Sequence, residues 1–448
     1  MSRWVFAFVL LALSPVGSAR ADEDVTTFSL ENGLDVVVIE DHRAAAVTHM
    51  VWYRVGSADE EPGKSGIAHF LEHLLFKGTE KLEPGEFSQI VQANGGSDNA
   101  FTSWDYTGYF QRVAADRLEL LMELEADRMR NLQLTEEVVL PERDVVLEER
   151  NQRVENSPGG LFGEQRRASQ WLNHRYGIPI IGWRHEIAEL GLEDALEFYR
   201  RYYAPNNAIL IVAGDVEPQE VRMLAQKHYG PLEPTIDLPE RERVQEPPQL
   251  AERRVMFSDA RVAQPYVLRT YLAPERDAGD QEMAAALTIL AALLGGDGAT
   301  SYMGQRLVHE EHRAVYVSAF YSGLSLDDTT FGLIVVPTAD VSLEEAETDM
   351  DRMIAGFVSD GVNLDDLARI KMQIRADEIY GRDSVDGRAR RYGTALTSGL
   401  TVEDVQNWPD VLQAVTAEDV VAAAEMVFDR RKAVTGYLQR LEQAEATQ

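Results

Sequence analysis

Residues 66–77 read GIAHFLEHLLFK. On an α-helix, His69, Glu72 and His73 lie at positions i, i+3 and i+4 and therefore share one face. The other positions are mostly apolar, so we expect this helix to be buried. Burial would desolvate the three ionisable groups, and a bound cation would offset the free energy that this desolvation costs. The stretch predicts a helix with a hydrolytic metal site, in which both imidazoles reach one ion and the carboxylate lies beside it. The alternative is a structural helix with satisfied histidines and a salt-bridged glutamate.

The length and an internal similarity predict the fold class. The chain has 448 residues, of which 45% are hydrophobic and 26% charged, and this is too long for one hydrophobic core. Residues 191–216 and 416–441 both read as a helix, a turn and a strand, about half the chain apart. We therefore predict an α+β fold of two homologous domains, each a mostly antiparallel sheet packed with helices, arranged like a clamshell.

The domain boundaries follow from composition. Residues 231–250 are rich in proline and charge and have no sustained apolar period, which indicates a linker. We expect an N-terminal metal-bearing domain at residues 22–230 and a homologous C-terminal domain without a metal motif at residues 251–448.

Residues 1–21 have the pattern of a cleaved secretory signal peptide. Arg3 precedes an apolar run, and Ala19-Arg20-Ala21 forms an A-x-A cleavage site. An uncleaved membrane anchor is the alternative, but the run is shorter than the ~20 residues that span a bilayer, and no later stretch is long enough. We expect a periplasmic protein with no membrane span after signal removal. Its stability cannot come from disulfides, because the chain has no cysteine.

The net charge of −32 argues against nucleic-acid and anionic-membrane partners. It could favour basic peptides or reflect a saline habitat, but scattered acidic residues on solvated helix faces are the simplest interpretation.

Several local elements bear on the site. Residues 25–40 predict two strands around a turn at Glu31-Asn32-Gly33, and residues 100–113 read as one strand because they are rich in aromatic and β-branched residues. Residues 156–160 (NSPGG) indicate a break before a helix at 161–172.

A catalytic zinc usually has three protein ligands and one open position, so a third ligand is needed. The predicted helix at residues 136–154, with Thr135 as its N-cap, offers Glu142 and Glu149, seven residues apart and nearly on one face. Glu148 is rotated about 100° from Glu149 and is the weaker candidate. Spacing alone does not distinguish this helix from other acidic helices of the chain.

Four groups of segments carry a resemblance to a known family. The first is residues 69–73 (HFLEH) with 76–79 (FKGT) and 142–149 (ERDVVLEE). The others are residues 99–103 (NAFTS), 176–182 (YGIPIIG) and 202–207 (YYAPNN). Together they closely resemble the pitrilysin and insulinase family of inverted-motif zinc peptidases (M16), and most of all the bacterial relatives of the mitochondrial processing peptidase. The resemblance covers essentially all of the chain after residue 21.

The resemblance implies an activity and a set of roles. His69, His73 and Glu149 would ligate one zinc ion per chain, Glu72 would be the general base of a metalloendopeptidase, and Glu142 would orient or balance the site. It also implies that an unfolded peptide substrate pairs as an added strand with Asn99, Ala100 and Phe101. From the residues alone this segment is only a strand.

The second half departs from the family pattern. Active relatives have an arginine and a tyrosine seven residues apart, which help to hold the substrate. Here Tyr316 matches the tyrosine and would share its catalytic role, but His309 stands where the arginine belongs, and neither Arg306 nor Arg313 has the spacing. We predict the catalytic subunit of a heterodimer with a paralogue that carries the arginine and tyrosine. The alternatives are a homodimer in which His309 is a tolerated substitution and a non-catalytic assembly subunit of the same fold.

Overall fold

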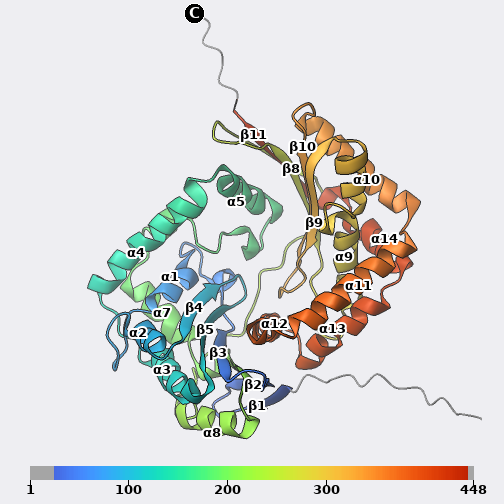
Figure 1. The fold of residues 1–448 in the computed structure, drawn as a ribbon. Helices are drawn as coiled ribbons and strands as arrows, with labels where there is room; N and C mark the ends of the chain where they lie inside the picture. Colours follow the sequence, from blue (N-terminus) through green and yellow to red (C-terminus); the bar gives the residue numbers. More distant parts are fainter. Residues whose placement is uncertain (1–24, 442–448) are drawn as a thin grey trace, which may run out of the picture.

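The computed structural model describes residues 25–441, so the signal peptide predicted at residues 1–21 lies outside the described residues. The chain forms two similar halves, each built on one sheet, as predicted (Figure 1). Residues 231–250, the predicted linker, contain neither helix nor strand. No helix of residues 25–441 is long and apolar enough to cross a bilayer.

The first half contains a six-stranded sheet in the order β1-β2-β6-β3-β5-β4. Its strands are β1 (Val25–Ser29), β2 (Asp35–Glu40), β3 (Ala46–Tyr53), β4 (Ser97–Thr102), β5 (Thr107–Ala114) and β6 (Ala208–Gly214). The β2–β6 pair is parallel and the other pairs are antiparallel. Its helices are α1 (Ile67–Leu74), α2 (Glu86–Ala93), α3 (Leu118–Arg130), α4 (Glu136–Arg150), α5 (Pro158–Gln170), α6 (Arg184–Ile187), α7 (Leu192–Tyr202) and α8 (Pro218–His228).

The second half contains a five-stranded sheet in the order β7-β11-β8-β10-β9. Its strands are β7 (Arg253–Asp259), β8 (Tyr266–Ala273), β9 (Ala314–Tyr321), β10 (Thr329–Pro337) and β11 (Ala433–Arg440). Its helices are α9 (Glu282–Ala291), α10 (Leu343–Asp360), α11 (Leu364–Gly381), α12 (Val385–Thr397), α13 (Val402–Ala414) and α14 (Ala417–Val427). The predicted repeat is confirmed. Helix α7 leads into β6 and helix α14 leads into β11, and each of these strands has one parallel and one antiparallel neighbour in its sheet.

Each half lends a helix to the other half's sheet (Figure 1). Helix α12 packs on β3 and β6, where Trp52 and the α12 residues Ala389 and Tyr392 belong to one buried cluster. Helix α5 packs on β7, β8 and β11, where the buried side chain of Phe162 lies. The two sheets are therefore covered on one face by helices of their own half and on the other by a helix from the partner half.

Two local predictions were wrong in detail. The single strand predicted at residues 100–113 is divided into β4 and β5 by a turn, in which Ser103 N donates to Tyr106 O at 2.8 Å. The aromatic residues that suggested strand continue through this turn. The break at residues 156–160 is shorter than predicted, because α5 begins at Pro158 and Ser157 Oγ caps Gly160 N at 3.1 Å.

Candidate active site

Helix α1 begins at a position that only glycine tolerates well. Gly66 has φ = +91°, and a Cβ atom there would lie 2.5 Å from the carbonyl oxygen of Ile181. The buried carboxylate of Glu60 accepts hydrogen bonds from Gly66 N and Ala68 N at 3.0 Å each. A carboxylate at this end satisfies amide groups that the first helical turn leaves free. The helix that carries the HFLEH segment is thus fixed at its start.

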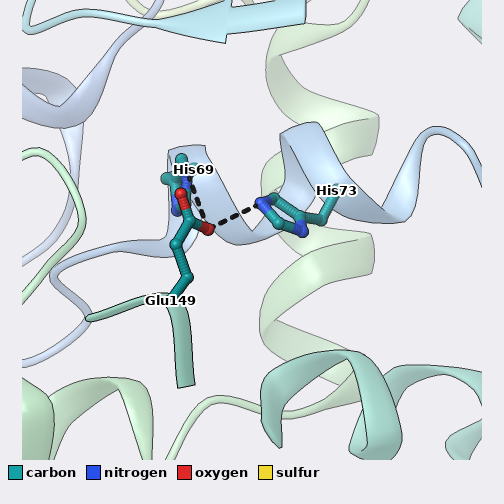
Figure 2. Close-up of side chains that lie close together, drawn as sticks. All are labelled: His69, His73 and Glu149. Atoms are coloured by element: carbon teal, nitrogen blue, oxygen red, sulfur yellow. Dashed lines mark ion pairs between the residues drawn. The ribbon is translucent and has the colours of Figure 1, made fainter. Parts of the chain in front are cut away.

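Helix α4 brings the third candidate ligand to α1. Thr135 occupies the predicted N-cap position, although its side chain makes no capping hydrogen bond. Glu149 Oε2 lies 3.2 Å from His73 Nε2 and 3.7 Å from His69 Nε2 (Figure 2). These three atoms all lie within 4.8 Å of one another. The structure therefore brings together all three residues predicted to bind the metal.

The three side chains fit a zinc ion. Ligands at 2.0–2.1 Å from a tetrahedral zinc are about 3.3 Å apart, close to the observed separations. Glu149 Oε2 is buried without a hydrogen-bond partner, and so is Nδ1 of His69. A buried carboxylate oxygen without a hydrogen bond costs desolvation free energy, and a cation bound between this oxygen and the two imidazole nitrogens would offset that cost.

Glu142 supports the site from behind His73. Its Oε1 lies 3.0 Å from His73 Nδ1, and its Oε2 pairs with Lys77 Nζ. Burial opposes protonation of His73, but the hydrogen bond with Glu142 and the charge of Glu149 raise its pKa to about 9. Burial also opposes ionisation of Glu142, yet His73 and Lys77 lower the pKa of this carboxyl overall. Glu142 thus orients the ring so that Nε2 points at Glu149.

His69 and Glu149 have pKa values shifted by different causes. Burial, with a smaller contribution from His73, lowers the pKa of His69 to about 4, so its imidazole is neutral at pH 7 and can act as a ligand. The contact with His73 lowers the pKa of Glu149. Arg153 Nη1 lies 2.6 Å from Glu149 Oε1, the oxygen that does not face the imidazoles.

Glu72 lies between the metal-binding side chains and the sheet. Burial raises the pKa of its carboxyl, and a hydrogen bond of 2.6 Å from Thr102 Oγ1 to Glu72 Oε2 opposes only part of this shift. Thr102 is the last residue of β4, which is the edge strand next to β5 in the sheet formed by the described residues. The candidate base and the free strand edge are therefore directly connected.

A cavity of about 800 Å³ opens beside these groups. Its lining includes His69, Glu72, His73 and Glu149 together with the predicted substrate residues Asn99, Ala100 and Phe101. The Phe101 ring lies against Trp52 at 4.8 Å, on the sheet face that α12 covers. What Phe101 offers to the cavity is therefore mainly its backbone, as pairing with an extended peptide requires.

Two predicted site residues, Glu142 and Tyr316, do not line this cavity, and of these Glu142 contacts His73. Tyr316 makes no such contact with the predicted metal ligands. It lies on β9 with 52% of its surface exposed. The nearby arginines have other partners: Arg313 pairs with Asp349 at 2.6 Å, and Arg306 lies 3.6 Å from the ring centre of Tyr302. Neither arginine therefore substitutes for the family arginine that His309 replaces.

Four contributors were missed by the sequence reasoning: Lys77, Thr102, Arg153 and Arg167, all of which contact or line the site. Only Arg153 had a local signal, since it is four residues after Glu149 on a helical segment. Among residues 25–441, the other cluster with metal-ligating spacing is Glu40, His42 and Glu217, which is largely exposed and also in the first half.

Comparisons with known proteins agree with this geometry. The model of insulinase, peptidase family M16, matches residues 35–183, and that of the peptidase M16 inactive domain matches residues 189–374. The zinc protease PqqE of Helicobacter pylori is 33% identical over 419 residues, which cover 92% of this chain and 91% of that protein. The chain belongs to peptidase family M16. Another relative, an uncharacterized zinc protease of Mycobacterium leprae, is 29% identical over 92% of this chain and 91% of its own length.

Solved structures place the M16 fold on the whole described chain. A protease from Helicobacter pylori has a TM-score of 0.87 and 31% identity, covering 93% of this chain and 99% of that one. The periplasmic protease PqqL from Escherichia coli has a TM-score of 0.80 at 19% identity, covering 93% of this chain but 48% of that one. The fold of this chain thus corresponds to about half of that longer M16 protein.

Proposed function

We propose that this M16 protein is a zinc-dependent endopeptidase that hydrolyses unfolded peptides. One observation carries the proposal: Nε2 of His69, Nε2 of His73 and Oε2 of Glu149 converge beside the buried Glu72 carboxylate, in a cavity that reaches a free strand edge. His69, His73 and Glu149 would hold one zinc ion per chain. The two relatives are named zinc proteases, and these names agree with this assignment.

The residues around the ion have complementary tasks. A zinc ion held by these residues would supply Lewis acidity for the attack of water on a peptide carbonyl. Glu72 has a pKa raised by burial, so its carboxylate can accept the proton of the attacking water and then deliver it to the leaving amine. Thr102 holds Glu72 in place, and Glu142 fixes the ring of His73. Both contacts keep the base and a ligand in a set orientation before substrate arrives.

The substrate would be an extended segment rather than a folded protein. Strand β4, with Asn99, Ala100 and Phe101, lies at the edge of its sheet, and a peptide can pair with the backbone of such an edge whatever its side chains. The N–H of Ala100 would first have to leave the side chain of Asn99, to which it donates at 2.9 Å. A folded substrate has few free segments of this kind.

We further propose that the chain is the catalytic subunit of a two-chain assembly. His309 replaces the expected arginine, and the two nearest arginines are engaged by Asp349 and Tyr302. A paralogue that carries both the arginine and the tyrosine would complete substrate binding, and the half-length match to PqqL leaves room for a second unit of this size. Full peptidase activity of the purified chain as a homodimer, without gain from any co-expressed paralogue, would contradict this part.

Zinc analysis and two variants test the peptidase proposal. We expect about one zinc per chain, loss of zinc in His73→Ala, and retention of zinc with loss of peptide cleavage in Glu72→Gln. Glu148→Gln is a matched control, because Glu148 lies on α4 and is exposed. No zinc in protein prepared without chelators would favour the non-catalytic assembly subunit, and an active Glu72→Gln variant would remove Glu72 as the base.

We also propose that the protein acts in the periplasm after removal of residues 1–21. N-terminal sequencing of protein recovered from the exported fraction should begin at Asp22. A mature protein that retains the apolar run would instead favour an anchor.

A further inference from the structure

A partly buried arginine also lines the active-site cavity. Arg167 lies on α5, and its guanidinium carbon is 4.3 Å from the ring centre of Trp104, which also lines the cavity. Trp104 follows β4 in the turn that joins it to β5. The arginine therefore stands beyond the Thr102 end of the strand edge to which the peptide would pair.

The charged side chains near Arg167 form ion pairs with residues other than Arg167. Arg153, the other arginine that lines the cavity, pairs with Glu149 at 2.6 Å. Glu164, one helical turn before Arg167, pairs with Arg150 at 2.8 Å. Within residues 25–441, the Arg167 side chain makes no ion pair and no hydrogen bond. Its stacking on Trp104 is the interaction that remains.

The absence of a counter-charge is unfavourable at this position. Burial lowers the pKa of Arg167 to about 10, and among the described residues no carboxylate is near enough to raise it again. The neighbouring Arg166 donates to Thr270 Oγ1 at 2.7 Å and likewise pairs with no carboxylate in the part of the chain that the structure describes. An arginine stays charged at pH 7 even when its pKa falls by this amount, so the cavity wall carries a desolvated cation.

We infer that Arg167 binds a carboxylate of the peptide substrate. The guanidinium carbon lies over the Trp104 ring, and the N–H groups of this side chain have no hydrogen-bond acceptor among residues 25–441, so they are available for a bidentate contact with two carboxylate oxygens. The inference rests on the proposed peptidase function and adds a substrate class to it: peptides with an acidic group near the cleaved bond.

The position of Arg167 relative to Glu72 limits where the acidic group can lie in the substrate. Thr102 contacts Glu72, and Trp104 is only two residues further along the chain. An extended peptide advances about 3.3 Å per residue, so Arg167 can reach a group within a few residues of the cleaved bond, which is attacked by the water that Glu72 deprotonates. Either an aspartate or glutamate side chain or a free C-terminal carboxylate would supply it. This preference is the opposite of what the net charge of −32 suggests for the surface as a whole.

A peptide scan tests the inference. A neutral peptide with blocked termini would carry one glutamate at successive positions around the cleaved bond, each paired with the same peptide carrying glutamine. A further pair would differ only in a free or amidated C-terminus. We expect kcat/KM to be roughly 10- to 100-fold higher for glutamate than for glutamine at one position, the effect of one hydrogen-bonded charge pair. An effect confined to the free C-terminus would identify that carboxylate as the ligand.

Two variants assign the effect. In Arg167→Gln the ratio between the acidic and neutral peptides should fall to about 1, whereas Arg375→Gln, the same change on an exposed part of α11, should leave the ratio as it is. An equal preference for all peptide pairs in the unmodified protein would overturn the inference, as would an unchanged ratio in Arg167→Gln. A loss that is equal for acidic and neutral peptides would also overturn it, because Arg167 would then only pack on Trp104.

Binding separates this inference from the peptidase proposal. Affinities of the same peptides for the full mature chain with Glu72→Gln can be measured by fluorescence anisotropy, which needs no cleavage. A glutamate preference in binding that disappears in Glu72→Gln/Arg167→Gln supports the anion contact even if no peptide is cleaved. No glutamate preference in binding, together with normal cleavage, refutes the anion contact and leaves the peptidase standing.

Discussion

Replacing Glu142 tests the organisation of the metal site without removing a predicted ligand. The buried carboxylate lies 3.0 Å from His73 Nδ1 and pairs through its other oxygen with Lys77. In Glu142→Gln an amide oxygen can still accept from Nδ1–H, but the negative charge is lost and Lys77 keeps no partner there. In Glu142→Ala the hydrogen bond is lost as well. Glu142→Gln therefore removes only the negative charge, whereas Glu142→Ala removes both the charge and the hydrogen bond that orients His73.

The expected magnitude follows from these contacts. Partners that orient a metal-bound histidine contribute about 10- to 100-fold to metal affinity. Because the glutamine keeps a hydrogen bond, Glu142→Gln should lose about 10-fold in zinc affinity, or about 1.4 kcal/mol. Glu142→Ala should approach 100-fold, or about 2.7 kcal/mol, because His73 is then free to rotate.

Competition with a chromophoric zinc chelator at fixed pH measures both variants. Glu148→Gln is the control, since it removes the same charge from an exposed position of the same helix and should bind zinc as the unmodified protein does. Equal zinc affinity in all four proteins would show that Glu142 does not orient His73. A loss as large in Glu148→Gln would show that net charge alone is responsible.

Two further predictions concern the second half. A Cβ on Gly393 of α12 would lie 2.0 Å from Trp52 Cε2, so Gly393→Ala should lower the free energy of unfolding by about 1–3 kcal/mol in urea titrations, while Gly381→Ala, which meets nothing within 4 Å, should not. Burial opposes ionisation of Glu347, but Arg254 and Tyr437 lower its pKa to about 2. Because the folded pKa is below the unfolded value of 4.5, its contribution of about 3 kcal/mol is present above pH 4.5 and lost as the pH falls towards 2. Glu347→Gln should therefore be destabilised at pH 7, and its difference from the unmodified protein should shrink between pH 5 and pH 3; a constant difference would contradict the assigned pKa.

Local spacing explains why part of the site was predictable. The i, i+4 separation of His69 and His73 is a property of one helix, and α1 forms where the pattern indicates it. Glu149 reaches the same point only through the tertiary packing of α4 on α1, so spacing could not select it from other acidic residues, and the family resemblance did. The hydrogen bond from Thr102 to Glu72 likewise depends on how β4 meets α1.

The fold was predictable in its repeat but not in its packing. Matching patterns in residues 191–216 and 416–441 revealed two similar halves, because each pattern is local. The apolar face of α12 shows that the helix is buried, but not that it covers the sheet of the other half. The turn between β4 and β5 was missed since its aromatic residues, among them Trp104, have strand propensity but pack as a corner.

The exchange of α5 and α12 has a thermodynamic consequence. A fragment ending at residue 230 would keep every predicted zinc ligand but lose α12, and would leave Trp52 and its neighbours on the sheet uncovered. The remainder of the chain would lose α5 in the same way. The unit that folds and unfolds cooperatively is therefore the whole pair of halves, so cleavage of the linker should yield a nicked protein that melts in one transition rather than two independent domains.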